Sequence, residues 1–138
     1  MGLRTIKFRG KSIYDEEWLY GSLVKIEKDR YAVIPPLNDI DIGKSIGMYE
    51  VCLETISQFT GSFDGIGKEI YEGDLVADRS SLKIVAYIEK RGYFCAVSMR
   101  DLDLINRYDK HVVPGLDKFN KLWVVANIYD HPQLIKEE

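Results

Sequence analysis

The sequence predicts a mainly β protein, with an α+β arrangement as the alternative. Three observations predict it: apolar residues recur at every second position in several short segments, glycine- and proline-containing turns separate these segments, and no long amphipathic helical pattern is present. At 138 residues the chain has the size of one domain. We expect a single domain over residues 1–138, in which an N-terminal β lobe (1–60) and a C-terminal lobe (61–138) can be distinguished.

The N-terminal half predicts a strand followed by a hairpin. In residues 4–11, Ile6 and Phe8 alternate with basic residues, so this strand has one basic face. Residues 18–26 and 31–34 read as the two arms of a hairpin joined by polar turn residues, and Pro35-Pro36 ends it because neither proline has an N–H to donate. The other elements expected in this half are a surface loop at 37–47 and a short strand at 48–52.

The central segment 54–76, ETISQFTGSFDGIGKEIYEGDLV, is the richest in turn residues. It predicts a short strand at 56–59, a turn at Thr60-Gly61, a second turn at 64–67 and a sharp entry into a strand at 72–74. We expect Asp64 and Asp74 to accept hydrogen bonds from nearby backbone N–H groups, while the glycines adopt conformations that a Cβ would penalise.

The C-terminal half predicts four strands. Residues 100–121 are ambiguous between a short helix around 102–108 and irregular structure, with a forced break at Pro114-Gly115. Aromatic residues in the expected strands of both halves ordinarily pack against an opposite sheet; these are Trp18, Tyr20, Tyr93, Trp123 and Tyr129. The C-terminal elements expected are strands at 74–77, 82–90, 93–98 and 122–128, a turn at 90–92 and one helical turn at 132–135.

Four collinear blocks of this sequence resemble the YopX proteins, a family encoded in bacteriophages and prophages. The blocks are KFRGK at 7–11, WLYGSL at 18–23, QFTG followed by D..GKEIYEGD within 58–74, and ANIYDHPQL at 126–134. The resemblance implies a mostly β architecture whose second half is similar to an SH3-like, partly open barrel built from these strands, and a phage origin. It brings no activity, cofactor or catalytic residue. The chain departs from the family pattern at Cys52-Leu53, Ile66-Gly67 and Ala126, which puts the exact turn geometry around the first two pairs in doubt.

Charge and motif content disfavour a dedicated nucleic-acid binder and a catalytic site. The formal net charge is −3, without the basic excess of most such binders, although Lys7, Arg9 and Lys11 share a strand face that could bind single strands beside exposed aromatic rings. A charged strand face is more often simply solvated, and lysine on an edge strand also discourages unwanted pairing.

Four carboxylates fall within eleven residues of the central segment, which is the kind of cluster that a Mg²⁺-dependent nuclease needs. They are Asp64, Glu69, Glu72 and Asp74. We favour the alternative in which the two aspartates organise turns and the two glutamates lie on a solvated edge. The histidines, His111 and His131, stand twenty residues apart with no ligand at metal-binding spacing. Cys52 and Cys95 have apolar neighbours, so both are expected to be free, buried and unreactive thiols.

These observations lead to a non-enzymatic phage or prophage accessory protein of the bacterial cytoplasm that acts through contacts with a phage or host protein, without a cofactor, metal or membrane segment. It is also expected to self-associate. The alternative is a nucleic-acid-binding module that uses Lys7, Arg9 and Lys11. The remaining motif residues are expected to serve the fold; they are Gln58, Thr60, Gly61, Asp64, Gly67, Glu72, Gly73, Asp74, Asn127 and Tyr129.

Overall fold

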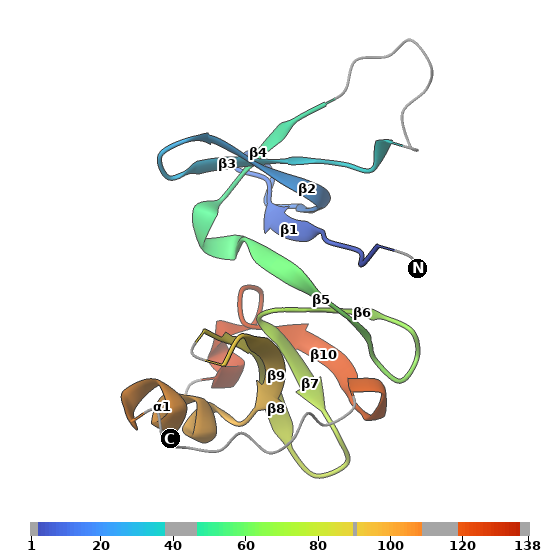
Figure 1. The fold of residues 1–138 in the computed structure, drawn as a ribbon, viewed down its shortest axis with the longest axis vertical. Coiled ribbons are helices and arrows are strands. Elements are labelled where there is room, and N and C mark those ends of the chain that lie inside the picture. Colours follow the sequence, from blue (N-terminus) through green and yellow to red (C-terminus); the bar gives the residue numbers. More distant parts are fainter. Residues whose placement is uncertain (1–2, 38–46, 90, 109–118, 136–138) are drawn as a thin grey trace. The chain divides into compact units, whose positions relative to one another are not determined.

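The computed structural model describes residues 3–37, 47–89, 91–108 and 119–135, and its ordered elements are mostly antiparallel strands (Figure 1). The prediction of a mainly β fold is confirmed. A six-stranded sheet has the order β4-β3-β2-β1-β5-β6, and a four-stranded sheet has the order β10-β7-β8-β9. The chain divides into two compact units, Met1–Phe59 and Thr60–Glu138.

The N-terminal unit contains the predicted hairpin. Strand β2 (Trp18–Glu27) pairs with β3 (Arg30–Ile34), which pairs in turn with the short strand β4 (Tyr49–Val51). The first strand, β1 (Phe8–Lys11), is shorter than predicted, and residues 4–7 precede it without regular structure. Most of the loop expected at 37–47 lies outside the described residues.

The N-terminal sheet curls, so that the end of β1 bonds to β4 as well as to β2. The Cys52 N–H donates to the Lys11 carbonyl at 2.8 Å, and Ser12 forms a bridge with Val51. This approach requires Gly10, because a Cβ there would lie 2.8 Å from the Cβ of Val51. Val51, Ala32 and Val33 are among the most buried side chains of the unit. A 3-10 turn (Leu53–Thr55) then leads into β5.

Strand β5 (Ser57–Phe63) contradicts the predicted turn at Thr60-Gly61. The strand runs through both residues because a partner is available along its whole length: its first half pairs with β1, and its second half lies beside β6 (Glu69–Tyr71). The Thr60 hydroxyl donates to the Ile70 carbonyl at 2.8 Å. Gly61 has a positive φ of 88° inside the strand, so the residue that suggested a turn is accommodated within the sheet.

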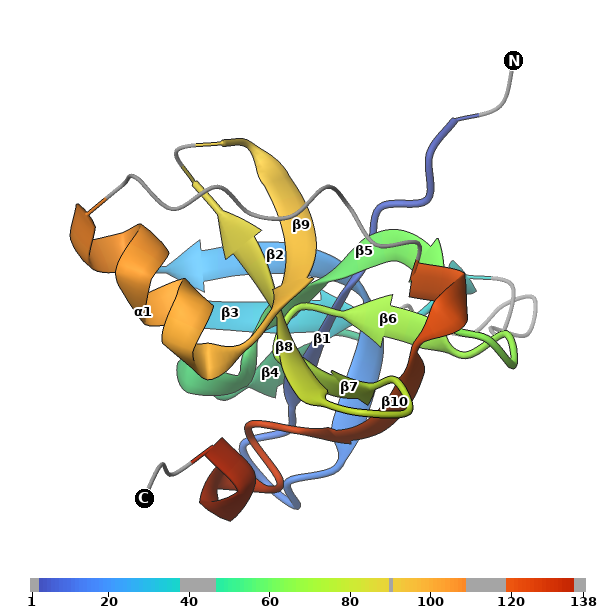
Figure 2. The ribbon, with the colours of Figure 1, turned by 90° about the horizontal axis from the view of Figure 1, so that it is seen from below.

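The C-terminal sheet contains strands close to those predicted, with the ends trimmed. Its central strands are β7 (Asp74–Ala77) and β8 (Leu82–Ile88), and its edges are β9 (Tyr93–Val97) and β10 (Trp123–Asn127). The described strands form an open sheet, and the SH3-like character implied by the family stays a prediction. The ambiguous region holds a helix, α1 (Met99–Tyr108), which lies beside the β8–β9 hairpin in Figures 1 and 2. The Ser98 hydroxyl caps this helix by accepting the Asp101 N–H. The break expected at Pro114-Gly115 falls outside the described residues, and short 3-10 helices follow at Phe119–Lys121 and Pro132–Ile135.

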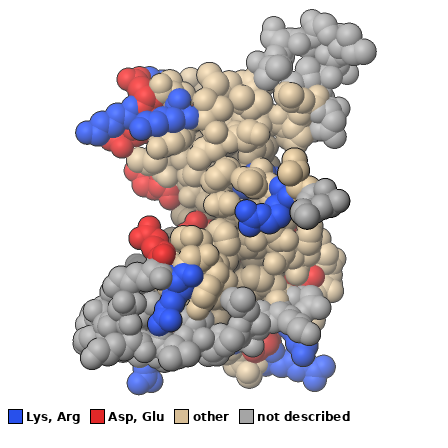
Figure 3. All heavy atoms as spheres, in the orientation of Figure 1, with Lys and Arg blue, Asp and Glu red and all other residues tan. Residues whose placement is uncertain are grey.

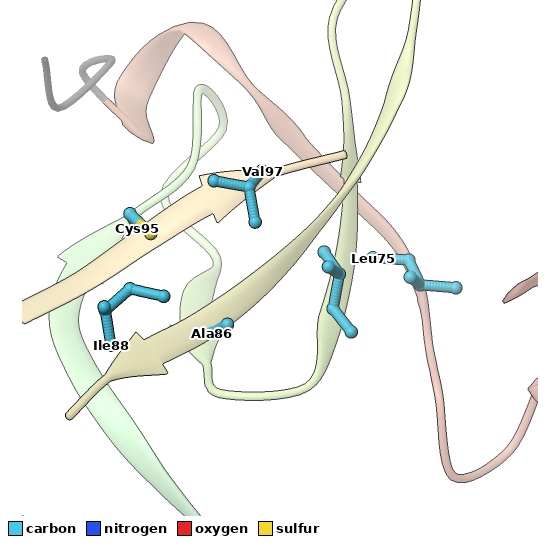
Figure 4. Close-up of a cluster of buried hydrophobic side chains, with 6 residues drawn as sticks. Leu75, Ala86, Ile88, Cys95 and Val97 are labelled. Atoms are coloured by element: carbon cyan, nitrogen blue, oxygen red, sulfur yellow. The ribbon is translucent and has the colours of Figure 1, made fainter. Parts of the chain in front are cut away.

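The largest core cluster lies on one face of the C-terminal sheet, where alternate residues of β7, β8 and β9 meet (Figure 4). Met99 and Leu102 of α1 and Ile135 pack against this face. A second cluster on the opposite face joins Val76 and Val85 to Ile70 and Leu122. Both faces of β8 are therefore buried over much of its length, which explains why apolar residues occupy both alternating sets of positions in that segment.

Candidate functional site

The basic residues of the first strand lie against aromatic rings. In the β1–β2 ladder Arg9 is opposite Tyr20 and Lys11 is opposite Trp18, so these side chains share one face. The guanidinium carbon of Arg9 lies 4.6 Å from the centroid of the Trp18 ring, and the Lys11 Nζ lies 5.4 Å from the same centroid. Lys7 places its Nζ 5.5 Å from the centroid of Phe59. We call Lys7, Arg9, Lys11, Trp18 and Phe59 the cation–aromatic stack.

The solvated basic face expected here is wrong at its central residue. Arg9 is only 5% exposed, and its Nε donates a hydrogen bond of 3.0 Å to the hydroxyl of buried Ser57. The alternation placed the three cations on one face, but it gave no information on the Trp18 ring that lies against the guanidinium. Cations held over aromatic faces contribute about 0.5 to 2 kcal/mol each, depending on how far they are desolvated. Arg9 therefore has a role in the packing of this unit, whereas Lys7 and Lys11 stay partly exposed.

Asp64, in the turn between β5 and β6, uses both carboxylate oxygens to hold backbone. Its Oδ1 accepts the N–H groups of Ile66 and Lys68, each at 2.9 Å, and its Oδ2 accepts the Val124 N–H at 3.0 Å. Burial, the largest single influence, raises the pKa of Asp64, but the N–H groups of Val124, Lys68 and Ile66 together bring that pKa below its ordinary value. The predicted backbone bonds are confirmed, and they reach further than expected, because one of them joins the turn to the last strand.

Asp74, at the start of β7, also accepts a backbone hydrogen bond, from the Tyr71 N–H at 2.8 Å. It is buried, whereas Glu72 is half-buried in the turn between β6 and β7. The Tyr71 hydroxyl donates to Glu69 Oε1 at 3.0 Å. Within the described residues, no three histidine, cysteine or acidic side chains lie close enough together to hold a metal ion.

The remaining motif residues lie in turns and at strand ends. Gly67 and Gly73 share a positive φ of 88°, and the Gly73 N–H donates to the Val85 carbonyl. Asn127 ends β10, and its Oδ1 accepts the N–H groups of Tyr129 and Asp130. Tyr129 thus follows the last strand instead of lying within it. Gln58 is opposite Phe8 in the β1–β5 ladder.

The two cysteines differ in environment. Both are free; Cys95 is buried, but Cys52 is only half-buried, so the expectation of two buried thiols is wrong for Cys52. Burial raises the pKa of Cys95 to about 11, which keeps its thiol protonated at neutral pH. Among the described residues there is no helix of the length and apolar character needed to cross a membrane.

A row of apolar side chains is the feature that the sequence reasoning missed. Trp123 is opposite Ala77, which is opposite Leu82, so the three lie side by side on the same sheet face as the larger core cluster. Trp123 and Leu82 are each 41% exposed. We call these residues the Trp123 row. The sequence predicted that Trp123 is buried, because tryptophan in a strand usually is. Instead, α1 and Ile135 pack against the core cluster on this face and leave Trp123 and Leu82 partly exposed, which no local pattern signals.

Comparisons with known proteins agree with this fold. The family model described as YopX protein matches residues 7–136. The structure titled "Crystal structure of protein EF1440 from Enterococcus faecalis" matches with a TM-score of 0.56 and 20% sequence identity, and the match covers 97% of this chain and 100% of that one. At this identity the likeness shows the fold alone. A search of curated proteins finds no match. Because the family model spans nearly the whole chain, the protein is a member of the YopX family.

Proposed function

We propose that this protein is a non-enzymatic phage or prophage accessory protein of the bacterial cytoplasm that acts by binding another protein. The Trp123 row is the observation that carries the proposal. Tryptophan is enriched at the centres of protein interfaces, where its large apolar surface is removed from water. In this protein a half-exposed tryptophan stands in register with a half-exposed leucine, on a sheet face that is otherwise covered.

The non-enzymatic part of the proposal is supported by the hydrogen bonds of the central segment. Asp64 has both oxygens occupied by backbone N–H groups, and Asp74 is buried with a backbone N–H on Oδ2. A general base or metal ligand needs a carboxylate oxygen directed at substrate or ion. These contacts favour structural roles for the two acids that seemed best placed in the sequence.

The test is a comparative affinity capture from bacteria that carry the phage or prophage. The bait is the tagged wild-type protein beside a Trp123→Ser, Leu82→Ser variant and a Tyr87→Ser control. Tyr87 is also 41% exposed but lies on the opposite face of the sheet, where its ring contacts Phe94. We expect a defined protein to be captured by wild type and control and lost from the double variant. Capture of the same proteins by all three folded baits would contradict the proposal.

Nucleic-acid binding is the second candidate, favoured by the interleaving of cations and aromatic rings in the cation–aromatic stack. Proteins that bind single strands combine such rings with cations, and phosphate contacts make binding steeply salt-dependent. On the face seen in Figure 3, however, the described Lys and Arg side chains stand in small separate groups.

The assay for this candidate is binding of single-stranded DNA at several salt concentrations. Because Arg9 is buried, the informative variant is the double substitution Lys7→Gln with Lys11→Gln. The control is the double substitution Lys25→Gln with Lys28→Gln, which removes the same amount of positive charge elsewhere in the unit. Nucleic-acid binding predicts loss in the first variant only. Equal affinity of both variants and wild type would remove this candidate.

A further inference from the structure

The two edge strands of the C-terminal sheet, β10 and β9, differ in whether the described chain bonds to their outer backbone groups. At the β10 edge, the turn that contains Asp64 covers the backbone: the Gly65 N–H donates to the Leu122 carbonyl at 2.9 Å, and the Val124 N–H donates to Asp64 Oδ2 at 3.0 Å. This arrangement satisfies backbone groups that would otherwise be open to another strand. The edge is therefore protected by the chain itself.

At the opposite edge, the side toward which each residue of β9 directs its N–H and C=O groups can be worked out from its neighbour β8. The Val85 carbonyl accepts the Gly73 N–H, so Val85 directs its backbone groups toward the β7 side. Backbone groups alternate in direction along a strand, so Ala86 directs its own toward β9, where it is opposite Cys95. Phe94 and Ala96 then direct their N–H and C=O groups away from the sheet.

Within the described part of the chain, no strand pairs with this outer side of β9. The devices that usually protect an edge are also missing from the strand: Tyr93–Val97 contains no charged residue and no proline, and its register with β8 has no bulge. The helix that follows packs Met99 and Leu102 on the sheet face and does not extend the edge. Figure 4 shows β9, which carries Cys95 and Val97, lying beside β8, which carries Ala86 and Ile88.

We propose that β9 pairs antiparallel with β9 of a second copy of this chain, about a two-fold axis that passes beside Cys95. The outward residues Phe94 and Ala96 stand symmetrically on either side of Cys95, so each Phe94 is opposite Ala96 of the other copy. Each such pair exchanges two N–H···O bonds, which gives about four across the junction. Because the strand is uncharged, this pairing sets no like charges opposite each other, and the self-complementary geometry is that of the commonest closed dimers.

This inference does not use the Trp123 row, which lies on a face of the sheet across β10, β7 and β8, whereas the inference concerns the edge formed by β9. Its test measures oligomeric state. Sedimentation of the full chain over a range of concentrations should show a shift from 15.9 kDa toward twice that mass. Ala96→Pro removes the outward N–H without removing a bond to β8, so it should sediment as a monomer throughout. Ala96→Ser keeps the N–H and should dimerise like the wild type.

Amide hydrogen exchange of the wild-type protein gives a second measurement that does not depend on the proline variant folding. The N–H groups of Phe94 and Ala96 should exchange quickly in dilute protein and become protected as the concentration rises. Protection that is already complete in the dilute monomer would mean that the chain covers its own edge, and would overturn the proposal. A wild-type protein that stays monomeric with both amides exchanging quickly would overturn it equally.

Discussion

Gly73 and Gly67 form a matched pair that separates backbone strain from side-chain packing. Both residues have a φ of 88°, so an alanine at either position incurs the left-handed penalty of about 1 to 2 kcal/mol. The surroundings differ. A Cβ on Gly73 would lie 2.7 Å from Cε2 and 3.1 Å from Cζ of Tyr129, whereas a Cβ on Gly67 has no heavy atom within 4 Å.

We therefore predict that Gly73→Ala destabilises the protein by about 1 to 3 kcal/mol more than Gly67→Ala, the range for forcing extra atoms into a packed site. The Gly73 carbonyl accepts the Ile128 N–H, and Asn127 holds the Tyr129 N–H, so the backbone on both sides of the ring is fixed. In a Tyr129→Ala background the steric contact is gone. There Gly73→Ala should cost the same as Gly67→Ala.

The assay is equilibrium unfolding in denaturant for the four members of the Gly73–Tyr129 double-mutant cycle and for Gly67→Ala in both backgrounds. Thermal melting gives a second readout, at roughly 2 to 5 °C per kcal/mol for a chain of this size. Equal losses for the two alanine variants would show that the Tyr129 ring moves aside freely. If Gly73→Ala lowers the unfolding free energy by the same amount after removal of Tyr129, the reasoning is also refuted, because the loss would then come from backbone strain and not from contact with the ring.

Further predictions concern the carboxylates, the thiols and one more glycine. Asp64→Asn should cost about 1.5 to 3 kcal/mol in denaturant unfolding, because one oxygen must be replaced by NH₂, whereas Asp78→Asn should be nearly neutral, since Asp78 accepts the Ser80 and Ser81 N–H groups through Oδ1 alone. The folded-state pKa of Asp64 is lowered, so its stabilisation is present above the unfolded pKa of about 3.9 and is lost as the pH falls through the folded pKa. The difference in unfolding free energy between wild type and Asp64→Asn should accordingly narrow below about pH 4, and a constant difference would contradict this assignment. The Cys95 thiol, with its pKa raised to about 11, should react with a thiol reagent at pH 8 only after unfolding, as followed by absorbance, and rapid reaction in the native state would argue against its burial. Gly21→Ala should prevent normal folding as judged by circular dichroism, because its Cβ would lie 2.0 Å from the Ile34 carbonyl oxygen, and a native spectrum would show that β2 and β3 can separate at that point.

Local patterns were sufficient for most strands. Alternation located the β2–β3 hairpin, because a strand with one buried face repeats every two residues whatever it packs against. The C-terminal strands were located as short apolar runs bounded by turn residues. The bonds of Asp64 and Asp74 to nearby N–H groups were also predictable, since their partners lie within a few residues. The Thr60-Gly61 turn was wrongly predicted. Threonine followed by glycine suggests a local bend, but these residues stay in strand β5 because β1 and β6 are available as its partners.

The amino-acid sequence by itself thus determined the class of fold, the order of the elements and the family. The tertiary structure decided which surfaces those elements expose: that Arg9 is covered by Trp18 while Trp123 is half-exposed, and that one sheet edge is held by Asp64 while no described strand pairs with the other. The reason is physical. Periodicity records on which face of a strand a residue lies, but the burial of that face depends on segments distant in sequence, whose approach no local pattern encodes.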